Sequence, residues 1–211
     1  MRVLALFSVL AFATAVQAAS PTPAVPKGVY TLDKAHTSLI FRVSHMGFSN
    51  FTGRFTRLDA KLETDPAKLS ASNLEVTIDP TSISSDNAPD GFLAELAGKG
   101  WLESQEFPEM KYRSTKVEQV APGKLRVYGA LTLHGVTKPV ILDAKYNGGY
   151  AGFAMDPQAR IGFSAHGTLK RSDFGISYGI PAPGTTMGVS DEVEIILETE
   201  LKGPPLDAPK N

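Results

Sequence analysis

Apolar and polar side chains alternate along most of the chain, so that apolar residues recur at every second position. Residues 192–200 are typical, because Val193 and Ile195 alternate there with glutamates. This period is characteristic of a strand with one buried and one solvated face. The same pattern predicts strands over residues 38–45, 73–79, 110–113, 125–133, 140–146, 161–165 and 192–200.

A further strand is predicted over residues 53–63, where the alternation breaks between Phe55 and Leu58 and indicates a bulge. Turn-forming pairs such as Pro122-Gly123 separate the runs, which number about eight. An antiparallel sheet with one apolar face must bury that face and protect its edges, and closure into a barrel does both. The predicted fold is therefore all-β, an eight-stranded antiparallel barrel, with a two-sheet sandwich as the alternative.

One helix is predicted over Pro89–Glu103, where Phe92, Leu93, Leu96 and Ala97 recur at helical spacing. The long stretch between Asp79 and Pro108 is too long for a tight hairpin. We expect this segment to lie across a mouth or a side of the barrel.

The chain begins with a predicted secretory signal over residues 1–18. Arg2 precedes an apolar run over 3–16, and Val16-Gln17-Ala18 is a small-x-small cleavage pattern. A membrane anchor is the alternative, but a spanning helix needs about 20 apolar residues. We predict a flexible leader at 19–28, a barrel domain at 29–202 and a flexible tail at 203–211.

Composition narrows the functional classes. The chain is 42% hydrophobic and has a formal net charge of −1 without clustered Lys and Arg, so a nucleic-acid partner is not expected. It contains no cysteine, which excludes disulfides, thiolate catalysis and thiolate metal sites. The predicted export points to the bacterial periplasm, with full secretion as the alternative.

Large apolar side chains also occur outside the strand runs. Phe48 and Phe51 lie in a glycine-containing stretch, and Phe174 lies in another. Apolar groups on loops are what the open mouth of a barrel needs in order to bind an apolar ligand. The candidate ligand-lining residues are Leu39, Phe41, Val43, His45, Phe48, Phe51, Phe92, Leu96, Trp101, Leu131, Leu133, Phe163 and Phe174.

The signals for catalysis are weak. The four histidines (His36, His45, His134 and His166) show no ligand spacing, so we expect each to bond a carbonyl or another partner near a turn. The sequence holds no Gly-x-Ser-x-Gly motif and no phosphate-binding loop. We therefore predict no catalytic residue, no metal ligand and no cofactor. A His- or metal-dependent enzyme acting on a small substrate stays as the alternative.

Several motifs, taken in order, resemble the YceI-like family of lipocalin-like, polyisoprenoid-binding proteins. The first reads Tyr30-x-x-Asp33-x-x-His36-Thr37-Ser38 and continues as Val43-x-His45-x-Gly47-x-Ser49-x-x-x-Gly53-x-Phe55. Others are Glu106-Phe107-Pro108 and Leu131-Thr132-Leu133-His134-Gly135-Val136-Thr137-Lys138-Pro139. The last are Leu169-Lys170-Arg171-Ser172-Asp173-Phe174-Gly175 and the strand Val193-Glu194-Ile195. The resemblance spans about residues 28–202.

The resemblance implies an eight-stranded barrel with one helix and a long apolar tunnel. It also implies that the tunnel carries or stores an isoprenoid lipid in the periplasm, either a polyprenyl phosphate or an isoprenoid quinone, without known catalysis. His45 or Arg171 would then face the head group. The stretch 87–93 lacks the histidine that is usual in the family, so the head-group end of the pocket is expected to differ. A homodimer and transient membrane contact are further expectations.

Overall fold

The computed structural model describes residues 24–206, and its regular structure is almost entirely antiparallel sheet. The strands within this range are β1 (Gly28–Leu32), β2 (Ser38–His45), β3 (Ser49–Phe55), β4 (Leu58–Thr64), β5 (Asn73–Ile78), β6 (Ile83–Ser84), β7 (Met110–Ala121), β8 (Lys124–Leu133), β9 (Val136–Tyr150), β10 (Gln158–Lys170) and β11 (Val189–Pro205).

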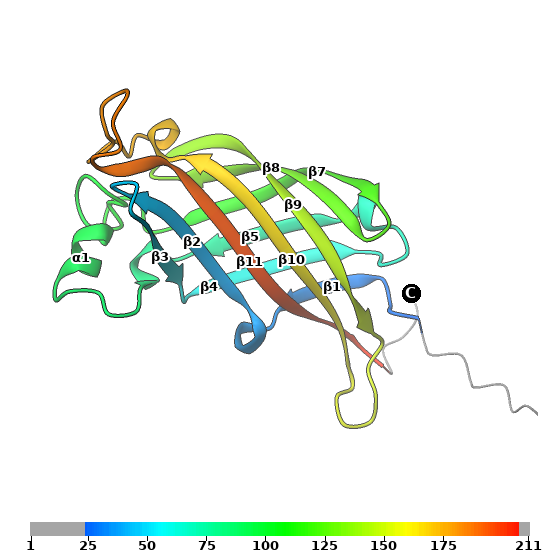
Figure 1. The fold of residues 1–211 in the computed structure, drawn as a ribbon. Coiled ribbons are helices and arrows are strands. Elements are labelled where there is room, and N and C mark those ends of the chain that lie inside the picture. Colours follow the sequence, from blue (N-terminus) through cyan, green and yellow to red (C-terminus); the bar gives the residue numbers. More distant parts are fainter. Residues whose placement is uncertain (1–23, 207–211) are drawn as a thin grey trace, which may run out of the picture.

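The sheet closes on itself. The strand order β1-β4-β5-β7-β8-β9-β10-β11 returns to β1, because Thr31 pairs with Lys202 and Leu32 pairs with Leu201. These eight strands form the predicted barrel, and the pairing of β1 with β11 rules out an open sandwich. The barrel is elongated, with α1 at one end and both ends of the described chain at the other (Figure 1).

The first three positions around the barrel are each occupied by two consecutive strands instead of one continuous strand. β1 continues into β2, β3 into β4, and β5 into β6, while β2 pairs with β11 and β3 pairs with both β2 and β6. The predicted irregularity between Phe55 and Leu58 lies where this break occurs, but it separates two strands and is not a bulge within one. Thr56 and Arg57 separate two strands with different partners, since β4 pairs with β1 and β5.

The segment between β6 and β7, residues 85–109, is named the flap. It contains the single α-helix of residues 24–206, α1 (Phe92–Ala97), which ends where Gly98 donates its backbone N–H to the carbonyl of Glu95. The predicted helix over Pro89–Glu103 exists but is shorter, because turns follow Gly98. Short 3-10 helices lie at Lys34–His36, Leu69–Ala71, Pro80–Ser82 and Arg171–Phe174.

The predicted domain edges need correction at both ends of the barrel. β11 runs to Pro205, so the segment 203–205 belongs to a strand and not to a tail. Gly28, expected in the leader, is the first residue of β1. The predicted signal over 1–18 lies outside the described residues.

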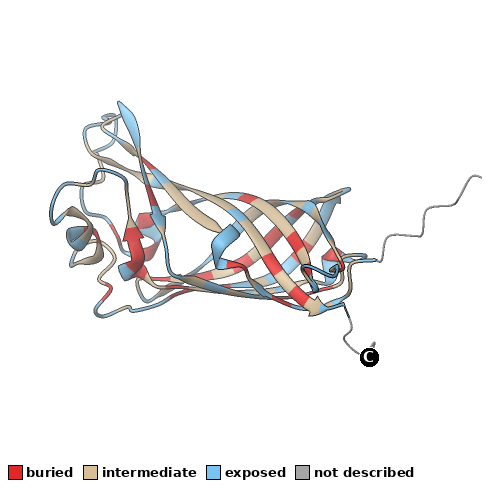
Figure 2. Ribbon diagram, turned by 90° about the horizontal axis from the view of Figure 1, so that it is seen from below, coloured by how far each residue is buried: buried red, intermediate tan, exposed pale blue. Residues whose placement is uncertain are grey.

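We call the end that carries the flap the mouth end and the opposite end the closed end. At the closed end, the lumen is filled by a cluster of Tyr30, Leu62, Ala159, Ile161 and Leu201, which are all 6% exposed or less. A second, larger cluster fills the middle of the barrel. Buried segments recur along the strands, whereas the loops at the mouth end are largely exposed (Figure 2). No helix within residues 24–206 has the length and apolar character to cross a bilayer.

Two buried tyrosines pack flat against glycines of a neighbouring strand. A Cβ atom on Gly203 would overlap the ring of Tyr30, and one on Gly129 would overlap the ring of Tyr112. Each phenol is satisfied by the backbone, because Tyr30 donates to the carbonyl of Pro26 at 2.5 Å and Tyr112 lies 3.2 Å from that of Val127. Burial raises the pKa of each phenol to about 12.

Candidate ligand-binding site

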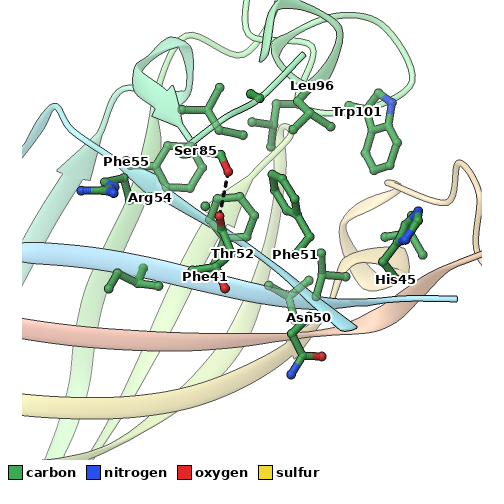
Figure 3. Close-up of a pocket in the computed structure, with 18 of the residues that line it drawn as sticks. Phe41, His45, Asn50, Phe51, Thr52, Arg54, Phe55, Ser85, Leu96 and Trp101 are labelled. Carbon is green, nitrogen blue, oxygen red and sulfur yellow. Dashed lines mark hydrogen bonds between the residues drawn. The ribbon is translucent and has the colours of Figure 1, made fainter. Parts of the chain in front are cut away.

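A cavity of about 810 Å³ opens at the mouth end, between the barrel wall and the flap. Its wall is built from the inward residues of β2, β3 and β11, and its cover comes from α1 and the turns after it. Most of the lining is apolar. On β3, Phe51 and Phe55 contribute large apolar side chains to this lining, and Asn50 and Arg54 border it on the other face of the strand (Figure 3).

Four phenylalanine rings cross the cavity from the flap to the wall. The ring centroids of Phe92 and Phe51 are 5.7 Å apart, those of Phe51 and Phe41 are 6.1 Å apart, and those of Phe41 and Phe55 are 5.5 Å apart. Gly53 leaves the space that the Phe41 ring occupies. Such a row of aromatic edges and faces offers continuous apolar contact to an elongated ligand.

The opposite side of the mouth is organised by Trp101 and the loop 175–188. The Trp101 ring lies 5.3 Å from the ring of Tyr178. The guanidinium of Arg171 lies 5.4 Å from the Trp101 centroid, in cation–π range. These contacts hold the flap against the loop that follows β10.

Arg171 is only 4% exposed, and its side chain is used to fix the loop. The guanidinium donates to four backbone carbonyls, at Ser190 (2.9 Å), Ile176 (3.3 Å), Tyr178 (2.7 Å) and Val189 (2.7 Å). Burial lowers the pKa of Arg171, while the charge of Asp191 opposes that shift. Arg171 therefore organises the rim and has little hydrogen-bonding capacity left for a head group.

The structure brings together eight of the predicted ligand-lining residues. Those that line the cavity are Phe41, Val43, His45, Phe51, Phe92, Leu96, Trp101 and Leu133. Leu39, Leu131 and Phe163 instead belong to the central core. Phe174 is buried in the same core at 1% exposure, and Phe48 is 82% exposed on the turn between β2 and β3. These five residues do not line the cavity.

Sequence reasoning missed part of the lining. Val193 and Ile195 were recognised as the apolar face of the last strand but were not assigned to the site. Met110 begins a strand whose depth in the barrel the alternation does not show. The additional apolar lining residues are Ile40, Ile83, Ala88, Pro89, Leu102, Met110, Leu169, Ile176, Val189, Val193 and Ile195.

The histidines other than His45 lie outside the cavity lining. His134 contacts the carbonyl of Phe174 through Nδ1 at 3.0 Å, and its Nε2 lies 3.6 Å from a carboxylate oxygen of Glu103 in the flap. Its ring also packs on Phe107, with centroids 4.7 Å apart. His134 thus joins the flap to the turn between β8 and β9.

One group within residues 24–206 brings potential metal ligands together, formed by Asp33, His36 and Glu200. Its centre is already paired with cations, because Asp33 contacts Arg160 and lies 3.3 Å from Lys202 Nζ. Burial by itself would raise the pKa of Asp33, but hydrogen bonds from His36, Arg160 and Lys202 outweigh it and hold that pKa far below the usual range. The group is an ion-pair cluster at the break between β1 and β2.

The rim of the mouth is apolar on one side and acidic on the other. Phe48, Tyr178 and Met187 are each more than 60% exposed, and Met46 N–H donates to Gly188 O at 2.7 Å to join their loops. The flap carries six acidic residues and one lysine, a net charge of −5 (1 − 6). An anionic group near the flap would therefore be repelled.

Known proteins resemble this chain in both sequence and fold. Residues 30–201 match the model of the YceI-like domain. The chain belongs to the YceI-like family. A UPF0312 protein of Vibrio cholerae serotype O1 is 33% identical to this YceI-like protein over 175 residues, which cover 81% of this chain and 85% of that one.

Solved structures share the fold of this YceI-like protein. The Campylobacter jejuni YCEI protein superimposes with a TM-score of 0.64 at 33% identity, covering 83% of this chain and 98% of that chain. A domain from Saccharophagus degradans, described as a polyisoprenoid binding domain implicated in plant cell wall breakdown, gives a TM-score of 0.59 at 18% identity, with the same coverage. At that identity the second likeness shows the fold alone.

Proposed function

We propose that this YceI-like protein binds and carries an isoprenoid lipid in the cavity at its mouth end. The observation that carries the proposal is the row of four phenylalanine rings along an apolar cavity of about 810 Å³ that is open at one end. Support comes from the YceI-like domain and from a domain of the same fold that is described as polyisoprenoid binding.

Burial of the chain supplies the affinity. Each buried CH₂ group contributes about 0.8 kcal/mol, whereas association costs about 4–15 kcal/mol of lost freedom. Several buried isoprene units therefore offset the cost of association. We propose binding rather than catalysis, since the histidine and carboxylate cluster around Asp33 lies outside the cavity lining and is paired with Arg160 and Lys202.

Between the two head-group classes, the charges favour an uncharged one such as a quinone. Arg171, the cationic candidate for a phosphate, already donates to four carbonyls. Arg54 borders the cavity but is already paired with Asp86 at 2.8 Å. The flap adds negative charge at the mouth, where a head group would lie, even after Arg54 and Lys111 pair with Asp86 and Glu109.

Extraction of the purified protein with organic solvent tests the proposal directly. Mass spectrometry of the extract should show a stoichiometric isoprenoid with an uncharged head group. A Val43→Trp variant places an indole in the cavity and should purify with less of that lipid than wild type purified in parallel. An extract free of isoprenoid, or equal lipid in both proteins, argues against the carrier function.

We further propose that the carrier acts in the periplasm after removal of residues 1–18. The support is the apolar run that ends at Val16-Gln17-Ala18. Intact-mass measurement of periplasmic material should give a mature N-terminus at Ala19 or Ser20. A mass that still includes Met1 to Ala18 contradicts the proposed processing.

A further inference from the structure

The cavity ends abruptly part of the way down the barrel. On β7 its lining includes Met110 but not Tyr112, the next inward residue, and on β8 it includes Leu133 but not Leu131. On β2 it stops in the same way above Leu39. These excluded residues belong to the central core and lie directly beneath the residues that line the cavity.

Tyr112 is the largest of these side chains and is held in place from several sides. It is 6% exposed, and it pairs with Leu131 across β7 and β8. Its ring covers the inner face of β8 at Gly129, where a Cβ atom would collide with it. Its hydroxyl lies 3.2 Å from the carbonyl of Val127 and 3.3 Å from that of Val140.

We propose that Tyr112 sets the maximum length of lipid chain that the cavity accepts, because its ring fills the lumen directly beneath the cavity. This inference rests on the proposed function, since it concerns the ligand of the same site. Gly129 contributes no side chain, so the Tyr112 ring takes up the lumen at that level. The residues directly above it along the two strands, Met110 and Leu133, already line the cavity. Loss of the ring therefore extends the cavity toward the closed end.

The present size of the cavity gives the expected limit. A volume of 810 Å³ holds about 27 heavy atoms if each takes ~30 Å³, the share of one water molecule in the liquid. That is the size of about five isoprene units. Longer chains gain no further burial in the wild-type protein, because the additional units remain outside the mouth.

Prenyl alcohols of five and eight isoprene units are suitable probes, titrated into delipidated protein by displacement of a fluorescent apolar dye. In wild type the two affinities should differ by less than about threefold, because the added units are not buried. In Tyr112→Ala the longer alcohol should bind about tenfold more tightly than the shorter one, since the new space buries more of its chain. Unchanged relative affinities in a folded Tyr112→Ala variant would overturn the proposal.

Matched variants separate a lengthened cavity from general loosening. Tyr112→Phe keeps the ring and should retain the wild-type preference. Tyr112→Leu carries the test if Tyr112→Ala does not fold, and it should also favour the longer alcohol. Tyr30→Leu makes the same change over Gly203 at the closed end, away from the cavity.

The remaining outcomes separate a wrong role for Tyr112 from a wrong carrier function. A preference for the longer alcohol in Tyr30→Leu equal to that in Tyr112→Leu rejects Tyr112 as the limit on chain length, because loosening alone would then produce the effect. Failure of wild type to bind either alcohol rejects the proposed carrier function itself. Binding of both alcohols by wild type without any change in preference in the Tyr112 variants rejects only the role of Tyr112.

Discussion

The two ends of the barrel are built from the same alternating pattern but treat their lumen differently. At the closed end β1 pairs with both β4 and β11, so strands surround the lumen completely, and residues such as Tyr30 and Ile161 fill it. At the mouth end β6 pairs only with β3 among the described strands, and the flap takes the place of further sheet. Apolar alternation therefore makes a dry core where strands close the circle and a cavity where a flap replaces them.

The largest expected effect concerns Tyr30. Tyr30→Ala should lower the free energy of unfolding by about 4 kcal/mol, because it removes a fully buried ring and leaves a hole over Gly203. Phe51→Ala at the mouth should cost only about 1 kcal/mol, since its ring already borders open space. Urea unfolding of both variants measures the difference. Equal losses would mean that the two ends are packed alike.

Asp33 lies in the break between β1 and β2. Asp33→Asn should cost about 3 kcal/mol at neutral pH, because it removes the buried negative charge that pairs with Arg160 and Lys202. The pKa of Asp33 is lower in the folded than in the unfolded state, so this stabilisation is complete above the unfolded pKa of about 4 and declines as the pH falls below it. Wild type and variant should therefore differ less at pH 3 than at pH 7. A pH-independent difference would contradict this assignment.

A tryptophan substitution in the filled part of the barrel should lower the free energy of unfolding by about 2 kcal/mol more than one at the mouth. Ala165→Trp, in the filled part of β10, should cost about 3 kcal/mol through overpacking. Val43→Trp should cost less than about 1 kcal/mol, because the indole can enter the cavity that Val43 lines. Thermal unfolding of the two delipidated variants gives the comparison. A strongly destabilised Val43→Trp protein would show that the cavity is a packed core in solution.

The smallest effect on stability is expected at the rim. Phe48→Ser should change the free energy of unfolding by less than about 0.5 kcal/mol, since the side chain is 82% exposed. It should nevertheless slow the transfer of bound lipid to vesicles, because Phe48 stands at the mouth. Val120→Ser removes an exposed apolar residue near the closed end and serves as the control. Equal transfer rates in both variants would remove the rim from the exchange pathway.

The sequence predicted the barrel well, but it predicted the interrupted strands near the start of the chain poorly. Alternation along β8 and β11 is regular and suffices to identify both strands. The alternation marked the break between β3 and β4 but not the change of partner at Thr56, which is a tertiary event. β1 escaped notice because its five residues follow a proline-rich stretch.

For the candidate site, the sequence shows which face of a strand a residue occupies but not how deep in the barrel it lies. Alternation correctly identified Phe41 and Phe163 as apolar positions on their strands, but only the first lines the cavity. How far down the barrel a residue lies depends on the stagger between strands, which a single strand does not reveal. Phe48 was misplaced for another reason, because Met46 and Gly47 adopt positive φ angles and form a tight turn that leaves it exposed.

The contact between β1 and β11 has a consequence for how the chain folds. Two residue pairs of β1, Thr31–Lys202 and Leu32–Leu201, and seven pairs between β2 and β11 close the circle, and they join the start of the described chain to its last strand. Contacts so distant in sequence are slow to form, and closure must wait until β11 exists. Before closure, the unpaired edges of β1 and β11 are free to pair with other chains. Destabilising this closure should therefore first appear as slower refolding and increased aggregation, before any effect on a ligand is seen.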